Sequence, residues 1–159
     1  MFSVGDKVVY PMQGVGVVEK IENRVFSGMI REYLIVKILA NNMEVMIPTD
    51  MVAKSNLRKI SDNSTLENVL SNLTVKDDTE EKLSNKERYE NNVNKFKAGT
   101  LKDSLEVVLD LVHINKNKKL NSSEKQLFHS AQKFLVEEVS CIKNITLTEA
   151  DIYLKKRLN

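Results

Sequence analysis

The spacing of apolar residues changes near residue 60, and this change constrains the fold more than any other feature of the sequence. Before it, apolar residues fall in short runs that end at Gly, Pro or Asn, which is typical of β-strands. After residues 57–60, apolar residues recur with the 3.6-residue period of amphipathic helices. A chain of 159 residues is long enough for two small domains. We therefore predict an α+β fold in which a small β-barrel over residues 1–58 precedes an all-α helical bundle over residues 62–159.

Short strands are expected in the first half of the chain at residues 7–10, 17–21, 33–39 and 43–47. Pro11 and Pro48 end the first and the last of these runs, and Asn41-Asn42 is a turn signal between the last two. The segment Gly14-Val15-Gly16 is expected to break the chain before the second run. Residues 34–36 and 45–47 are apolar on both faces. Such strands are either buried on both sides or bury one face against a partner.

Helix starts in the second half are marked by a Ser, Thr or Asn that is followed three residues later by an acidic residue, as in a capping box. The pairs are Ser64/Glu67, Ser84/Glu87, Asn121/Glu124, Thr146/Glu149 and the weaker Thr100/Asp103. Gly99 has the position of a residue that ends a helix, directly before Thr100. These signals predict a bundle of four or five helices.

Charge is distributed unevenly, although the net charge is only +2. Residues 1–55 are neutral, with six basic and six acidic side chains, whereas residues 82–133 carry eleven basic against six acidic ones. An acidic patch at residues 77–81 precedes this basic stretch. A local basic excess supplies the sequence-independent attraction to phosphate that DNA binding needs. The alternative is a solvated helix surface that is rich in lysine.

No pattern in the sequence points to catalysis, a metal site or a cofactor. His113 and His129 have no second His or Cys at metal-ligand spacing, and Gly14-Val15-Gly16 lacks the rest of a dinucleotide fingerprint. The single cysteine, Cys141, fits a reducing compartment. We see no apolar run near the roughly 20 residues that span a membrane, and no signal peptide. We therefore expect a cytoplasmic protein that is not an enzyme and that binds no cofactor and no membrane.

One motif is specific enough to indicate a family. Residues 2–18 read FSVGDKVVYPMQGVGVV, and this run closely resembles the start of the CarD/CdnL family of bacterial transcription regulators. The resemblance continues in order through Glu32-Tyr33-Leu34, Ile47-Pro48, Arg88-Tyr89 and Ser123-Glu124-Lys125. It therefore covers essentially the whole chain.

For the first domain, the resemblance implies a Tudor-like barrel that binds the β subunit of RNA polymerase by pairing an exposed strand with it. Arg24 matches a family position that contacts the polymerase, and Met46 occupies a second such position. Arg31 and Tyr33 lie on the neighbouring strand and are further candidates. The alternatives are a place in the barrel core for Met46 and a solvated strand face for Arg31.

For the second domain, the resemblance implies contact with promoter DNA near the upstream edge of the −10 region. Relatives insert a tryptophan into the minor groove there. This sequence has no tryptophan, and aligning Arg88-Tyr89 with the family pattern W-x-R-R-Y places Asn85 at the wedge position. Glu87 and Glu90 stand where relatives have basic residues. The resemblance therefore implies DNA contact without the tryptophan wedge.

The candidate DNA-binding residues are Lys86, Arg88 and Lys125, together with Asn85 at the wedge position. Lys125 is expected in the first turn of a helix, where free N–H groups and the helix dipole favour phosphate. The alternative for each lysine is a solvated surface residue, and Arg88 has the further alternative of pairing with Glu87 or another neighbour.

Together these features predict a transcription regulator that binds the polymerase β subunit and modulates the stability of the promoter open complex. The predicted DNA contact is weak, is not sequence-specific and lies at the upstream fork. The alternative function is a polymerase-binding module whose helical domain contacts protein rather than DNA. We expect a monomer, with a strand-swapped dimer as the alternative.

Overall fold

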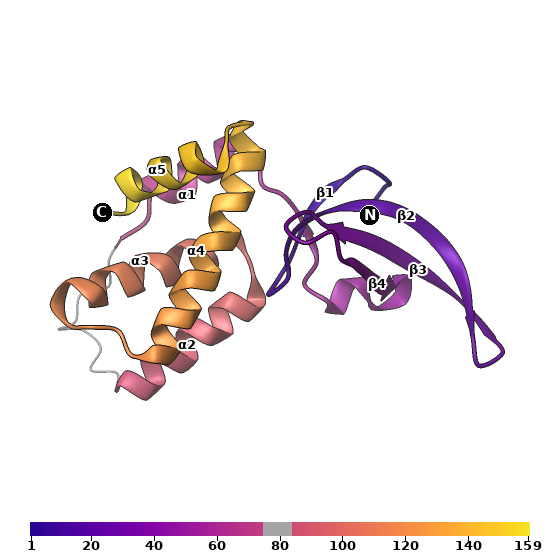
Figure 1. Ribbon diagram of the computed structural model, residues 1–159, viewed down its shortest axis with the longest axis horizontal. Helices are drawn as coiled ribbons and strands as arrows, with labels where there is room; N and C mark the ends of the chain where they lie inside the picture. Colours follow the sequence, from indigo (N-terminus) through magenta and orange to yellow (C-terminus); the bar gives the residue numbers. More distant parts are fainter. Residues whose placement is uncertain (75–83) are drawn as a thin grey trace. The chain divides into compact units, whose positions relative to one another are not determined.

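The computed structural model describes residues 1–74 and 84–159 (Figure 1). The chain divides into two compact units, Met1–Ile60 and Ser61–Asn159. The first holds a five-stranded antiparallel sheet and the second holds helices, so the predicted α+β fold class is confirmed. The predicted acidic patch at residues 77–81 lies outside the described residues. Within the described part, no helix has the length and apolar character needed to cross a membrane.

The sheet of the first unit has the strand order β4-β3-β2-β1-β5. Its strands are β1 (Lys7–Tyr10), β2 (Gly14–Phe26), β3 (Met29–Ile38), β4 (Glu44–Pro48) and β5 (Arg58–Lys59), and the 3-10 helix η1 (Thr49–Lys54) connects the last two. Strands β4 and β5 form the edges of this sheet. An edge strand leaves one row of backbone N–H and C=O groups without a partner strand.

One face of the sheet forms the core of the first unit. The core consists of Val8, Val18, Leu34, Val36, Ile38, Ile47 and Leu57. Successive side chains of a strand point to opposite faces. Because Leu34, Val36 and Ile38 of β3 belong to this core, Tyr33 and Ile35 project from the other face.

The prediction that Gly14-Val15-Gly16 breaks the chain is wrong. β2 begins at Gly14, and Gly16 pairs with Val8 on one side and Ile38 on the other. A Cβ atom on Gly16 would lie 2.7 Å from Val36 Cγ1 and 2.8 Å from the carbonyl oxygen of Lys37. Glycine is present here because two backbones approach closely in the middle of the sheet, which is a known role of glycine inside a strand.

The strands β2 and β3 are also longer than predicted. They continue to Phe26 and from Met29, respectively, whereas the expected runs were residues 17–21 and 33–39. A bulge between Val18 and Lys20 shifts their register. The extension is exposed or half-buried, so the burial pattern that marks a strand in a sequence is weak there.

The second unit is built from five helices within the described residues. These are α1 (Asn63–Ser71), α2 (Asn85–Ala98), α3 (Leu101–Asn117), α4 (Ser122–Lys143) and α5 (Leu147–Leu158). Leucine and valine side chains from α1, α3, α4 and α5 form one buried core. Phe96 of α2 stacks on Phe134 of α4, with ring centroids 5.9 Å apart. Phe96 also packs against the buried core, so α2 is attached to the other helices through this side chain.

Most predicted helix ends are confirmed. Ser84, Thr100, Asn121 and Thr146 are N-caps, and the capping box is complete at Asn121 and Thr146. Gly99 ends α2 with a φ of 73°. The prediction for Ser64 is wrong, because Asp62 caps α1 instead and accepts a hydrogen bond from the backbone N–H of Thr65 at 2.7 Å. Sequence alone does not decide between Asp62 and Ser64, since both residue types are good caps.

Glu67 joins three helices instead of completing a cap. Its carboxylate, on α1, accepts hydrogen bonds from Lys143 Nζ at 2.9 Å and from Arg157 Nη1 at 2.7 Å, and also from the Tyr153 hydroxyl. The ammonium of Lys143 lies 4.5 Å from the centroid of the Tyr153 ring. These three donors, led by the Tyr153 hydroxyl, lower the pKa of Glu67 to about 2. The cluster therefore holds α1 against the ends of α4 and α5.

The substitution Glu67→Gln is expected to lower the free energy of unfolding by about 1 kcal/mol at pH 7, a modest value because the cluster is partly exposed to solvent. A carboxyl whose pKa is depressed in the folded state stabilises fully above its unfolded pKa and loses that effect as the pH falls through the folded pKa. The difference between the two proteins should therefore shrink from pH 4.5 toward pH 2. Urea titrations across this range measure it, and a difference that does not depend on pH would contradict the assignment.

Candidate functional site

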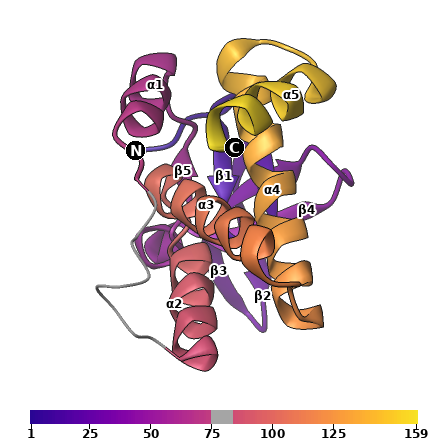
Figure 2. The same ribbon diagram turned by 90° about the vertical axis from the view of Figure 1, so that its left-hand side faces the viewer.

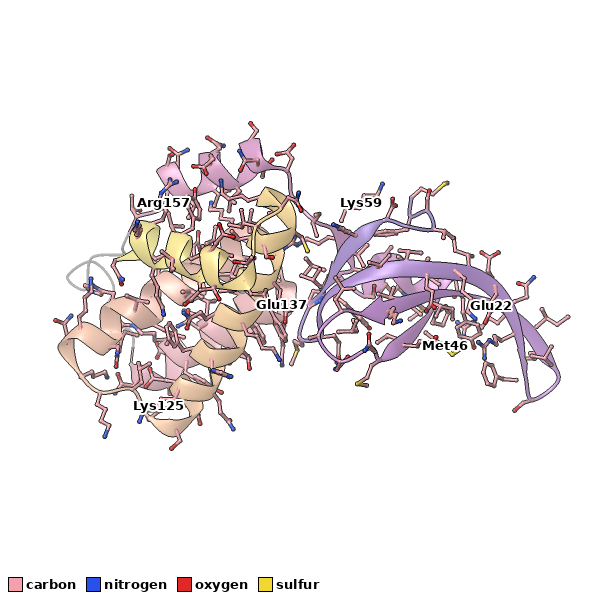
Figure 3. The ribbon with its side chains drawn as sticks, turned by 45° about the horizontal axis from the view of Figure 1, so that its top comes forward. Glu22, Met46, Lys59, Lys125, Glu137 and Arg157 are labelled. Carbon is pink, nitrogen blue, oxygen red and sulfur yellow. The ribbon has the colours of Figure 1, made fainter. Side chains whose placement is uncertain are left out.

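The four predicted polymerase-binding residues lie on one face of the sheet. Arg24 is the cross-strand partner of Arg31, and Ile35 is the partner of Met46. Since alternate residues of a strand share a face, Arg24, Arg31, Tyr33 and Met46 all project from the face opposite the core. We call this surface, which also includes Glu22 and Phe26, the hairpin face. Glu22 and Met46 are labelled in Figure 3.

Carboxylates hold both arginines of the hairpin face in position. Arg24 Nε donates to Glu22 Oε1 at 2.6 Å, and this bond is the main cause of a lowered pKa for Glu22. Arg31 Nη2 donates to both carboxylate oxygens of Asp50, at 3.1 and 3.2 Å. Two like charges directly opposite each other destabilise a sheet. Here the guanidinium of each arginine is paired with its own carboxylate, which reduces the repulsion between them. The two guanidinium groups therefore lie on the same face in fixed orientations.

The end of the β2–β3 hairpin is apolar and exposed. Beyond the last residues that pair with β1 and β4, the two strands continue as a ribbon (Figure 1). At its tip the exposed fractions of Val25, Phe26, Met29 and Ile30 are 65, 53, 74 and 72 %. A cluster of exposed apolar side chains indicates an interaction surface. Sequence reasoning missed this tip, although apolar pairs on both sides of Ser27-Gly28 are a hairpin signal.

Met46 lies on an edge strand next to the hairpin face. It is half-buried, is not part of the core of the first unit and lies on the edge strand β4. β4 pairs only with β3 among the described strands. The hairpin face therefore lies beside an open sheet edge. A protein bound there makes side-chain contacts with the face and backbone hydrogen bonds with the edge.

In the helical unit, Asn85 and Lys125 lie near the starts of two helices that pack together. Asn85 is the first residue of α2, and Lys125 is in the first turn of α4. The stacked rings of Phe96 and Phe134 lie at similar distances from the starts of these two helices. In both Figure 1 and Figure 2, α2 and α4 accordingly begin at the same end of the helical unit.

Exposed lysines surround this end of the helical unit. Lys118 Nζ donates to Asn85 Oδ1 at 2.7 Å, which ties the end of α3 to the start of α2. We call the exposed residues Lys86, Lys118, Lys119 and Lys125 the basic end. Lys118 and Lys119 belong to the basic stretch of the sequence but are not among the predicted DNA-binding residues. Their position beside Asn85 depends on how the helices pack.

Arg88 differs from the lysines of the basic end. It is half-buried, and its neighbour Tyr89 packs against the helical core. Of the acidic residues nearby, Glu87 and Glu90 are exposed on α2, whereas Glu124 is buried and completes the capping box of α4. The basic end therefore has a net positive surface, with two carboxylates along the exposed side of α2.

Comparisons with known proteins agree with the resemblance found in the sequence. Residues 2–61 match the family described as CarD-like/TRCF RID domain, and residues 68–155 match the family described as CarD, C-terminal domain. The proposed transcription factor YdeB of Bacillus subtilis (strain 168) is 38% identical over 146 residues, which is 92% of this chain and 95% of that protein. The solution NMR structure of the 72-residue N-terminal domain of Myxococcus xanthus CarD is 32% identical, with a TM-score of 0.32. The match covers 37% of this chain and 79% of the Myxococcus xanthus domain.

Proposed function

Because the chain belongs to the CarD family of transcription factors, we propose that it binds the β subunit of RNA polymerase through the hairpin face and promoter DNA through the basic end. The family is a non-enzymatic one, and its RID domain implies interaction with RNA polymerase. The DNA contact is proposed to be weak and not sequence-specific, and to lie at the upstream edge of the −10 region. There it modulates the stability of the open complex. We propose that the protein acts as a monomer.

The observation that carries the polymerase contact is the placement of Arg24, Arg31, Tyr33 and Met46 on one face beside an edge strand. Guanidinium groups that are held in place by carboxylates present their remaining N–H donors in a fixed orientation, which sets the register of a partner. The exposed tip adds apolar area of the kind found at the centre of interfaces.

The observation that supports the DNA contact is the basic end. Lysines attract phosphate without reading the base sequence, and two helix N-termini add the positive ends of their dipoles. Binding to the polymerase keeps the basic end near DNA, so a weak contact is sufficient. The protein has no tryptophan, and we therefore propose backbone contact without a wedge.

A second candidate function is a polymerase-binding module whose helical unit contacts protein. Two features favour it: Asn85 at the wedge position, and the carboxylates of Glu87 and Glu90 exposed on the same helix. A carboxylate beside phosphate is repelled, so DNA would be held less firmly along α2 than in relatives with basic residues there.

The substitution Lys125→Glu distinguishes the two functions. If the basic end contacts DNA, we expect the protein–polymerase complex to bind promoter DNA about tenfold more weakly, because one phosphate contact is lost and a repulsive charge is added. The slope of log affinity against log salt should fall by about 1. Fluorescence anisotropy with labelled promoter DNA measures both.

Lys156→Glu is the matched control, since Lys156 is an exposed lysine of α5 outside the basic end. It makes the same change in net charge and should leave DNA affinity near that of the unchanged protein. Equal effects of the two substitutions would show that only overall charge matters. No effect of Lys125→Glu would favour the function in which the helical unit contacts protein.

A further inference from the structure

A cavity of about 420 Å³ lies between α3, α4 and α5 of the helical unit. Its apolar lining comes in pairs from the three helices: Val108 and Val112 of α3, Phe128 and Leu135 of α4, and Leu154 and Leu158 of α5. Cavities of about 300–1,000 Å³ with mainly apolar walls are typical of small-molecule sites. The size and lining therefore fit a compact apolar group.

The floor of this cavity belongs to the folded core. Val108, Leu135 and Leu154 are only 3, 2 and 3 % exposed. Val112 and Phe128 are half-buried and form walls that remain open to a ligand. Protein interiors are otherwise closely packed, and an apolar hollow of this size gains contacts when an apolar group fills it. The ligand needs no rearrangement of the core to enter.

The polar residues at the cavity differ in how their charges are balanced. Gln132 donates to Asp151 at 3.2 Å, and Lys155 pairs with the same carboxylate at 2.9 Å. Lys116 also lines the cavity. Among residues 1–74 and 84–159 it has no ion-pair or hydrogen-bond partner. Lys116 is exposed and forms no ion pair with a described side-chain carboxylate, so its ammonium can pair with an anionic ligand.

We propose that this cavity binds a small monocarboxylate with an apolar body, with its carboxylate at Lys116. Charge complementarity selects an anion over a cation or a neutral molecule. The apolar lining selects an aliphatic or aromatic body over a sugar or a nucleotide, whose polar groups would lose hydrogen bonds to water. A free small molecule fits this cavity better than a protein segment, because the lining converges from three helices.

The test uses the full chain and sodium decanoate below its critical micelle concentration. We expect saturable shifts of the Val112 and Leu154 amide resonances in ¹H–¹⁵N NMR spectra. Decanol, which has no charge, should bind less tightly. Lys116→Glu should weaken decanoate about fivefold, equivalent to about 1 kcal/mol, and leave decanol unchanged. Lys119→Glu makes the same charge change outside the cavity and should have little effect.

Filling the cavity gives a second, independent test. Val112→Phe should reduce the binding of both decanoate and decanol by tenfold or more. If phenylalanine impairs folding, Val112→Met is used instead and should reduce binding to a smaller degree. Thermal unfolding identifies a folded variant. Three outcomes would overturn the proposal: no saturable shifts with decanoate, equal effects of Lys116→Glu and Lys119→Glu, or shifts confined to the exposed hairpin tip.

Discussion

Arg24→Glu is expected to weaken binding to RNA polymerase by about thirtyfold, which corresponds to about 2 kcal/mol. The change removes a guanidinium that Glu22 holds at 2.6 Å and places a second carboxylate next to it. Arg31 across the ribbon keeps its bond to Asp50, so the loss is local to one half of the hairpin face. Titration of labelled protein with purified polymerase measures the change.

Folding should be nearly unaffected by this substitution. The side chain of Arg24 is 40 % exposed, and an exposed ion pair contributes less than about 1 kcal/mol. Lys54→Glu is the matched control, because Lys54 is exposed in η1 and does not belong to the hairpin face. Unchanged affinity of the Arg24 variant, or an equal loss in both variants, would refute the hairpin face as the docking surface.

Gly16→Ala is expected to destabilise the first unit by about 3 kcal/mol, at the upper end of the effects of overpacking. The new methyl would lie 2.8 Å from the carbonyl oxygen of Lys37 and 2.7 Å from a methyl of Val36. The carbonyl belongs to the neighbouring strand β3 and cannot move without disturbing the register on both sides of β3. Denaturant unfolding followed by the amide NMR resonances of the first unit measures the change.

Gly28→Ala provides the comparison for this prediction. Gly28 has a φ of +79°, and a Cβ there would meet no atom within 4 Å. Only backbone strain is added, which costs about 1 kcal/mol. The Gly16 variant should be clearly less stable than the Gly28 variant, and the reverse order would contradict overpacking at Gly16.

Much of the fold could be predicted because its signals are local. A cap residue and the acidic residue three positions later are close in sequence, so Asn121 and Thr146 were identified correctly. The change of apolar period separated strands from helices for the same reason. The resemblance carried by residues 2–18 then implied candidate polymerase-binding residues in the first domain.

The features that were missed depend on contacts between distant segments. In the sequence Gly16 resembles a turn residue, because its close contact with β3 involves residues about 20 positions away. In the sequence Glu67 resembles part of a cap, because its hydrogen-bond donors Tyr153 and Arg157 lie far away along the chain. Lys118 becomes a neighbour of Asn85 only through packing of α2 against α3.

The half-life of a promoter open complex formed with cognate RNA polymerase tests the proposed bridge most directly. It should be compared with and without this protein, and with the Arg24→Glu and Asn85→Trp variants. Asn85 is exposed at the start of α2, so tryptophan can be placed there without disturbing the core, at the loss of one bond to Lys118. We expect a longer half-life with the protein, no increase with Arg24→Glu, and a further severalfold increase with Asn85→Trp, because an indole can enter the distorted minor groove. An unchanged half-life despite demonstrated polymerase binding would contradict the proposed bridge.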